Sequence, residues 1–276
     1  MLPTFLLSLR EGLEAALIIG ILLGALRKVN RPDLKSAVWA GTAAALLVSL
    51  AAGGALAALG FSLEGQVEYV FEGITMLLAA ALLTWMIFWM NRQGRFLRAE
   101  MEGKVRQAAA SAASRGALFG LAFFAVVREG IELALFLTAA AFALQGGAIW
   151  VGAGLGLGAA VLLGYLVFST TRRLDLRRFF QVTGVLLLLF AAGLVAHGVH
   201  EFNEAGWIPA VIEHVWDINP YLNEKSTPGE ILKALFGYNG NPSLTEVLAY
   251  LAYLGAVGMG LWRQNKTLAL PVTEVG

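Results

Sequence analysis

The 276-residue sequence contains no cysteine, and Asp, Glu, Lys and Arg together make up only 14% of the chain. Without cysteine the protein forms no disulfide and offers no thiolate to a metal. Any metal ligand must therefore be a carboxylate, carbonyl, imidazole or thioether, a set that favours harder ions over Cu(I). Soluble domains contain about 25% charged residues, whereas 58% of this chain is hydrophobic. We therefore expect the lipid bilayer to be the solvent of the protein.

Seven apolar stretches are long enough to cross a bilayer, whose hydrocarbon core takes about 20 residues of helix. They lie near residues 2–26, 36–60, 69–90, 115–144, 148–171, 179–201 and 244–262. The first stretch lacks the basic flank and small-residue cleavage site of a signal peptide, so we expect it to be retained. The sequence thus predicts an all-α integral membrane protein with seven transmembrane helices in one domain.

The charged residues outside these stretches are segregated by sign. Sixteen of the 20 lysines and arginines fall within residues 27–35, 92–115, 172–178 and 263–266, whereas acidic residues mark residues 64–68 and 204–230. By the positive-inside rule, the basic side is cytoplasmic, which predicts an external N-terminus and a cytoplasmic C-terminus in the inner (plasma) membrane. Beside a membrane, the basic segment 92–115 indicates contact with anionic lipid rather than binding of nucleic acid.

An Arg-Glu-x-x-Glu motif occurs twice, at residues 10–14 and 128–132. Three predicted spans separate the copies, so the two helices would cross the membrane in opposite directions. Transporters with such inverted repeats place the substrate site near the midplane, between the repeats. Weaker matches pair residues 37–41 with 148–152 and 70–72 with 179–181. We predict two inverted three-helix repeats at about 1–90 and 115–201, an external loop at about 202–243, and a seventh helix at about 244–262.

The motif has the chemistry of a cation site. The first and last residues of each copy are four apart and therefore share one helix face. A charged side chain at the bilayer centre costs about 2.5–3.5 kcal/mol, so these six residues must meet each other or a ligand. Pairing each arginine with the glutamate four residues later leaves two negative charges unbalanced, which favours a hard multivalent cation. The predicted metal ligands are Glu11, Glu14, Glu129 and Glu132, and the predicted supporting residues are Arg10 and Arg128.

Other interpretations of the motifs remain open from the residues alone. Each copy could be an intrahelical salt bridge that locks the helix bundle, or a proton relay. Clustered carboxylates could also form the di-metal centre of a membrane-bound metal-dependent enzyme. A seven-helix receptor or light-driven pump is disfavoured, because the last predicted span, at residues 244–262, contains no lysine for a retinal Schiff base.

A second group of polar residues lies at the predicted external ends of the third and sixth spans. These residues are spaced three or four apart, which allows them to bind a metal at an entrance; polar residues are also common at membrane interfaces. The possible entrance residues are Glu68, Glu72, His197, His200, Glu201 and Glu204.

Arg-Glu-Gly-Leu-Glu at 10–14 and Arg-Glu-Gly-Ile-Glu at 128–132, in the first and fourth of seven spans, resemble the oxidase-coupled iron permease family. This family includes the fungal high-affinity permeases, the bacterial EfeU-type ferrous iron permeases and some lead-uptake relatives. The stretch 200–209 resembles the bacterial branch.

The resemblance implies a permease domain over the whole chain, without enzymatic activity or a permanently bound cofactor. It implies iron as the transported ion, while the sequence itself leaves Fe²⁺, Fe³⁺ and the alternatives lead and manganese open. It also implies an extracytoplasmic oxidase or peroxidase as the iron-delivering partner. Nothing in the sequence indicates an oligomeric state.

Overall fold

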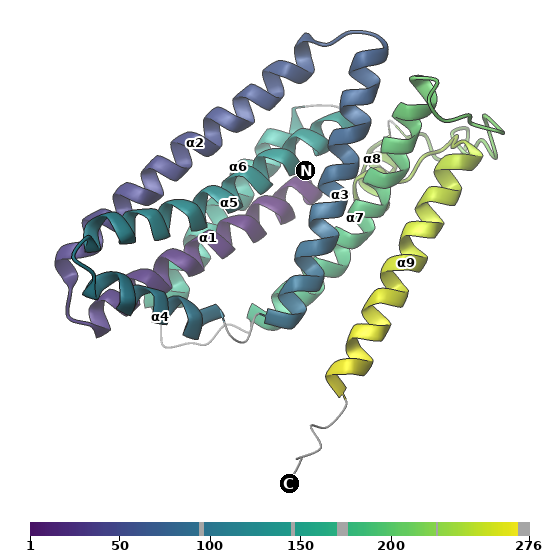
Figure 1. The fold of residues 1–276 in the computed structure, drawn as a ribbon. Helices are drawn as coiled ribbons and strands as arrows, with labels where there is room; N and C mark the ends of the chain where they lie inside the picture. Colours follow the sequence, from purple (N-terminus) through teal and green to yellow (C-terminus); the bar gives the residue numbers. More distant parts are fainter. Residues whose placement is uncertain (94–96, 145–146, 170–175, 225, 270–276) are drawn as a thin grey trace.

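The computed structural model describes residues 1–93, 97–144, 147–169, 176–224 and 226–269, and these residues contain no strand. Segments 94–96 and 172–175, which belong to two of the basic stretches, lie outside this description. The helices are α1 (Leu2–Lys28), η1 (Pro32–Leu34), α2 (Lys35–Ser62), α3 (Gln66–Gln93), α4 (Leu97–Ala110), α5 (Ser114–Ala143), α6 (Ala148–Ser169), α7 (Leu176–Glu204), α8 (Thr227–Phe236) and α9 (Leu244–Ala269). Figure 1 shows their arrangement.

Each of the seven predicted apolar stretches coincides with one long helix: α1, α2, α3, α5, α6, α7 and α9. Five of these, α2, α3, α6, α7 and α9, contain stretches long and apolar enough to cross a membrane. In α1 and α5 every 18-residue stretch includes at least three charged residues, which exceeds the charge expected of a simple lipid-facing span. The prediction of an all-helical protein with several membrane spans is therefore confirmed.

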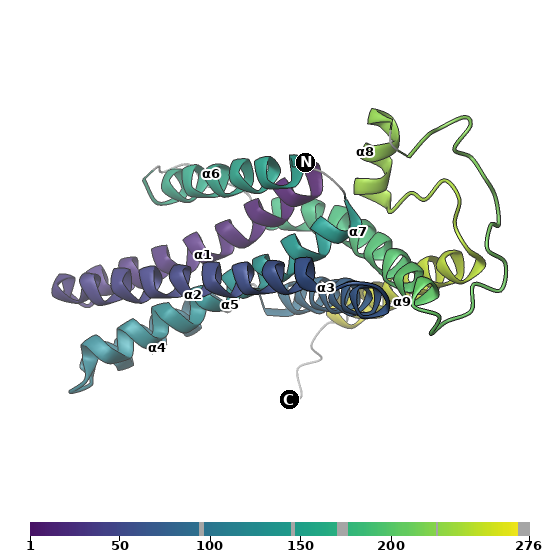
Figure 2. The same ribbon diagram turned by 90° about the horizontal axis from the view of Figure 1, so that it is seen from above.

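The long helices pack in pairs. α1 lies along α6, α2 along α5, and α3 along α7, while α9 packs mainly against α7. In Figures 1 and 2, α3, α7 and α9 stand together, with the other long helices to one side. The bundle has an acidic end, where α3 begins and α7 ends, and a basic end, where α1 ends and α4 lies.

Small residues set the close approach within two of these pairs. A Cβ atom added to Gly12 of α1 would lie 2.6 Å from the Cβ atom of Ala160 in α6, and one added to Gly130 of α5 would collide with Ser49 in α2. Such contacts let helix backbones approach closely in a membrane protein, where burial of apolar surface alone does not hold helices together. The same relation holds at two further positions, Gly164 beside Ala16 and Gly53 beside Ala134.

These glycine contacts yield a stability prediction. Gly12→Ala is expected to destabilise the protein by about 1–3 kcal/mol, because the added methyl group overpacks the α1–α6 contact. Ala160→Gly should restore much of this loss by making room for the methyl group. Gly24→Ala is the matched control in the same helix, since no heavy atom lies within 4 Å of an added Cβ there. Thermal unfolding in detergent measures all three; equal behaviour of Gly12→Ala and Gly24→Ala would contradict the packing described.

The basic segment between the third and fourth predicted spans contains a helix that the sequence analysis did not predict. α4 buries Met101, Val105 and Ala108 at helical spacing against α1 and α5. Lys28 Nζ of α1 lies 2.8 Å from Glu102 Oε1 of α4. The buried apolar residues of α4 are few and lie among charged residues. The composition of the segment therefore did not indicate a helix.

The long segment after α7 also contains a helix, α8, which the sequence analysis treated as part of a loop. The Ser226 hydroxyl accepts a hydrogen bond from the Gly229 amide and so caps the start of α8. Gly237 ends the helix in the left-handed conformation, at φ 67°. A Cβ on Gly193 of α7 would lie 2.5 Å from the Gly237 Cα atom, so the end of α8 is seated directly on the α7 backbone.

Candidate metal centre

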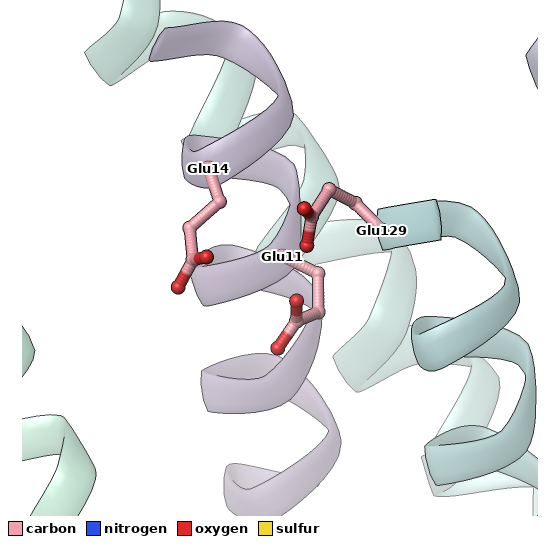
Figure 3. Close-up of side chains that lie close together, drawn as sticks. All are labelled: Glu11, Glu14 and Glu129. Atoms are coloured by element: carbon pink, nitrogen blue, oxygen red, sulfur yellow. The ribbon is translucent and has the colours of Figure 1, made fainter. Parts of the chain in front are cut away.

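Three of the four predicted metal ligands converge between α1 and α5. One carboxylate oxygen from each of Glu11, Glu14 and Glu129 lies within 4.8 Å of the other two, the spacing at which one metal ion could contact all three. Figure 3 shows the side chains of Glu11 and Glu14 leaving α1 and that of Glu129 reaching across from α5. Among the described residues this is the one group of three or more acidic or histidine ligands with such geometry.

The group is buried. Glu11 is 1% exposed and Glu129 is 6% exposed, while the Glu14 side chain retains 17% of its accessible surface. Glu11 and Glu14 are three residues apart on α1, so both side chains leave the same face of that helix. Gly12 and Gly130, inside the two motifs, face α6 and α2 and not the carboxylates. The motif therefore uses its glycine for packing and its acids for the site.

Each motif arginine pairs with the glutamate four residues later, as the spacing predicts. Arg10 Nε lies 3.3 Å from Glu14 Oε1, and Arg128 Nε donates a hydrogen bond to Glu132 Oε1 at 2.8 Å. The surroundings of the two pairs differ, because the Arg10 side chain has no exposed surface whereas 39% of the Arg128 side chain is exposed.

Glu132 is not part of the three-carboxylate group, so the structure does not bring all four predicted ligands to one point. Its Oε1 atom is held by Arg128. It remains near enough to act electrostatically on Glu11 and Glu14. The two motif copies are thus unequal: the copy on α1 contributes both acids to the group and the copy on α5 contributes one.

Several buried polar atoms of the site have no hydrogen-bond partner among the described residues. Leaving such atoms unsatisfied in an apolar interior costs about 1–3 kcal/mol each, and more for charged groups. They are concentrated in the two motifs: Arg10 Nη1, both carboxylate oxygens of Glu11, and Oε2 of Glu129 and Glu132; Arg10 Nε and Glu14 Oε1 likewise lack a hydrogen bond but form the ion pair described above. The site therefore has oxygen ligands to spare for a bound cation.

Three contacts that α3 makes with the motif arginines were not predicted from the sequence. Met90 Sδ accepts a hydrogen bond from Arg10 Nη2 at 3.6 Å. The Arg128 guanidinium carbon lies 5.5 Å from the ring centroid of Trp85 and 5.3 Å from that of Trp89. No motif marks these residues, and their partners are 80 and about 40 positions away in sequence, so only the fold brings them together.

The possible entrance residues lie at the acidic end but do not form a second metal group among the described residues. The carboxylate of Glu72 is within electrostatic reach of Glu68 on its own helix and of Glu201 on α7. His197 is half-buried, and its Nδ1 atom lies 3.0 Å from the Gly193 carbonyl oxygen of the preceding turn. Glu204 is exposed at the end of α7.

His200, another of these residues, is engaged with a carboxylate that the sequence analysis did not single out. Its Nδ1 atom lies 3.1 Å from Oε1 of Glu246 in α9. Glu246 is 3% exposed and also accepts hydrogen bonds from the Ser243 amide and from Asn239 Nδ2. The sequence Ser-Leu-Thr-Glu at 243–246 is a capping box, a signal from which the hydrogen bond between the Ser243 amide and Glu246 was predictable.

This network predicts how the segment between α7 and α9 is held. Glu246→Ala is expected to speed proteolytic cleavage within residues 205–243 about tenfold or more. The physical reason is that it removes the shared acceptor of His200, Ser243 and Asn239. Glu213→Ala, at an exposed position in the same segment, is the control. Limited proteolysis in detergent measures both, and indistinguishable cleavage rates would contradict a tethering role for Glu246.

The fold and the site define the class of protein: a multi-pass, all-helical membrane protein with buried acidic groups in its interior. The profile described as the Iron permease FTR1 family matches residues 1–271. The chain belongs to this family.

Several named proteins are similar in sequence to this chain over most of its length. The ferrous iron permease EfeU of Yersinia pestis is 35% identical over 255 residues, covering 92% of this chain and 90% of the relative. The proteins of the same name from Escherichia coli O157:H7 and Shigella sonnei are 37% identical over 261 residues, covering 92% of each chain. No solved structure matches the chain. The family is one of permeases, so the chain is not assigned an enzymatic activity.

Proposed function

We propose that this protein imports iron ions across the inner membrane through the group formed by Glu11, Glu14 and Glu129. The observation that carries the proposal is the convergence of three carboxylates from two helices, with oxygens within 4.8 Å of one another. Ionised carboxylates buried this close together repel each other strongly unless a cation lies between them. The relatives named above are ferrous iron permeases, which makes Fe²⁺ the first candidate for the ion.

The charge of the site suits a multivalent cation. Four motif glutamates face two motif arginines, so two negative charges remain uncompensated when all six groups are ionised. Both arginines are already paired with a glutamate of their own motif, Arg10 with Glu14 and Arg128 with Glu132. Glu11 and Glu129 are then the acids without a cationic partner of their own, and an Fe²⁺ ion between them balances the surplus. In this proposal iron is the cargo of the protein, not a resident cofactor.

We also propose that all seven long helices cross the membrane, including α1 and α5. α1 is 27 residues long and α5 is 30 residues long. The three motif charges of each helix lie against the bundle interior or neighbouring side chains and do not face lipid alone. The positive-inside rule then places the basic end, with α4, in the cytoplasm, and the N-terminus outside. The acidic end, with Glu68 and Glu204, faces outward and concentrates cations at the mouth.

The proposed inverted repeats, about 1–90 and 115–201, are supported by packing that recurs under exchange of the two halves. α1 pairs with α6 of the second half, and α5 pairs with α2 of the first. Residue contacts recur as well, with offsets of 118 for α1/α5 and 111 for α2/α6, the offsets of the motif and of the 37–41/148–152 match. The recurring contacts are Gly12–Ala160 with Gly130–Ser49, and Ala16–Gly164 with Ala134–Gly53.

The route to the site begins at the acidic end in this proposal. Glu68 and Glu72 follow one another along α3, with Glu201 of α7 beside them, so a cation entering there meets several carboxylates in turn. The segment 202–243 and α8 form the external surface. An extracytoplasmic oxidase or peroxidase that delivers iron would meet the protein there.

The experiment that tests this function is metal uptake into proteoliposomes containing the purified protein. We expect uptake of ⁵⁵Fe supplied as Fe²⁺ under anaerobic conditions to exceed that of protein-free vesicles at least about tenfold. Parallel assays with Mn²⁺, Pb²⁺ and Fe³⁺ decide among the alternative cargoes. Uptake of Mn²⁺ or Pb²⁺ in preference to either form of iron would overturn the assignment of iron, and equal rates with and without protein would overturn transport itself.

A further inference from the structure

We propose that one segment of α3 positions both motif arginines, with Trp89 as the principal positioning residue. The segment consists of Trp85, Trp89 and Met90 and is called here the α3 wall. The inference rests on the proposed function of the carboxylate group and deepens it. It assigns to a third helix, outside both motifs, the task of holding the guanidinium groups that orient the acids.

Arg10 and Arg128 come from different helices and meet the same stretch of α3. Arg10 has no exposed surface, and its Nη2 atom donates to Met90 Sδ at 3.6 Å. Arg128 lies over two indole rings, at 5.5 Å from the centroid of Trp85 and 5.3 Å from that of Trp89. The two rings are themselves stacked, with centroids 6.4 Å apart and planes inclined by 29°. They therefore present one aromatic surface to the cation.

The chemistry of the α3 wall fits a supporting role, because all of its contacts with the arginines are neutral. A thioether and two indole faces hold guanidinium groups without bringing another negative charge into the site. An acidic partner on α3 would instead compete with Glu14 and Glu132 for the arginines. Neutral partners keep each arginine available to its motif glutamate, and leave Glu11 and Glu129 available to the ion.

α9, the helix outside the proposed repeats, makes hydrogen bonds to α3 next to the α3 wall. Thr84 Oγ1 and the Tyr253 hydroxyl are 2.6 Å apart. Four residues further along α3, the Phe88 carbonyl accepts a hydrogen bond from Gln264 Nε2 at 2.9 Å, and Gln264 is 4% exposed. These contacts lie immediately beside the two tryptophans, so α9 sets the position from which the α3 wall meets the arginines.

The α3 wall is present on one side of the bundle only. With the offset of 109 given by the 70–72/179–181 match, the positions of α7 that correspond to Trp85, Trp89 and Met90 are Leu194, Gly198 and Val199. None is aromatic. This one-sided support parallels the unequal use of the two motifs, in which Glu132 stays with Arg128 while Glu129 joins the acids of α1.

The test compares Fe²⁺ binding by the purified full-length wild type with Fe²⁺ binding by the variants Trp89→Leu and Trp89→Phe. Titration calorimetry under anaerobic conditions gives the affinity. We expect Trp89→Leu to weaken Fe²⁺ binding at least about tenfold, the lower end of the effects seen when residues that orient metal ligands are replaced. Trp89→Phe should recover most of the affinity, because phenylalanine retains an aromatic face for Arg128. Trp150→Leu, at an exposed position on α6, is the matched control and should bind like the wild type.

A second comparison separates positioning from general packing. In an Arg128→Gln background, Trp89→Leu should cause no further loss of Fe²⁺ affinity, because its effect passes through the arginine. The inference would be overturned if Trp89→Leu still lowered Fe²⁺ affinity tenfold in the Arg128→Gln background. It would also be overturned if Trp89→Leu left Fe²⁺ affinity unchanged in the protein that retains Arg128. If Trp89→Leu does not fold, Trp85→Leu takes its place under the same criteria. Absence of Fe²⁺ binding by the wild type would instead overturn the proposed function, so the two failures are distinguishable.

Discussion

Glu129→Gln is expected to reduce Fe²⁺ uptake into proteoliposomes at least about 100-fold, the upper end of the losses seen when supports of a metal site are removed. The substitution keeps the size and shape of the side chain and removes its charge. Glu129 is the one ligand that α5 contributes to the three-carboxylate group, and it is 6% exposed, so water cannot replace it readily. Without it, the remaining acids both come from α1 and no longer bridge the two helices.

Glu100→Gln is the control for this prediction. Glu100 lies on α4, and about half of its side-chain surface is exposed in an ion pair with Lys104. Its replacement should leave uptake within about twofold of the wild type, since exposed pairs contribute little. Full transport by Glu129→Gln in folded protein, judged by size-exclusion chromatography and thermal unfolding, would remove the carboxylate group from the mechanism.

Arg10→Gln is expected to have the largest effect on folding of any single motif substitution. Removing one partner of a buried ion pair leaves an uncompensated charge and costs about 3–5 kcal/mol. Arg10 has no exposed surface and lies 3.3 Å from Glu14, with Glu11 next to it in sequence. We therefore expect a marked fall in the thermal unfolding temperature in detergent, together with loss of uptake.

The double substitution Arg10→Gln with Glu14→Gln separates these two effects. It removes both charges of the pair, so much of the lost stability should return, whereas uptake should not, because Glu14 is one of the three ligands. The exposed pair Lys104 and Glu100 has the same four-residue spacing and serves as the matched control. Lys104→Gln should cost only about 0.3–0.5 kcal/mol. If the double variant were no more stable than Arg10→Gln, the ion pair would not be the source of the loss.

The parts of this fold that follow from the sequence are those determined by local composition. Runs of about 20 apolar residues favour a helix in a bilayer, so the seven long helices were predictable, with most ends within a few residues, although α9 extends to Ala269, beyond the predicted end at 262. The Arg10–Glu14 and Arg128–Glu132 pairs follow from the helical period alone. The repeated motif also contains all three members of the carboxylate group, so these residues were predictable from its charge pattern.

The parts that did not follow are those determined by packing between distant segments. α4 buries a narrow apolar stripe inside a strongly charged segment, and so its composition suggested a loop. The separation of Glu132 from the other three acids depends on how α5 is rotated against α1, which the motif does not encode. The contacts of Trp85, Trp89 and Met90 with the arginines depend on where α3 passes the site.

The measurement that addresses the central claim most directly is an anomalous difference map of crystals grown anaerobically with Fe²⁺ and recorded at the iron edge. The proposed site predicts a peak between α1 and α5, with one oxygen from each of Glu11, Glu14 and Glu129 at about 2.0–2.2 Å, the range for transition-metal carboxylates. The peak should be absent from crystals of Glu129→Gln. A strong iron peak elsewhere in the protein, with no density between these three carboxylates, would contradict the site proposed for this permease.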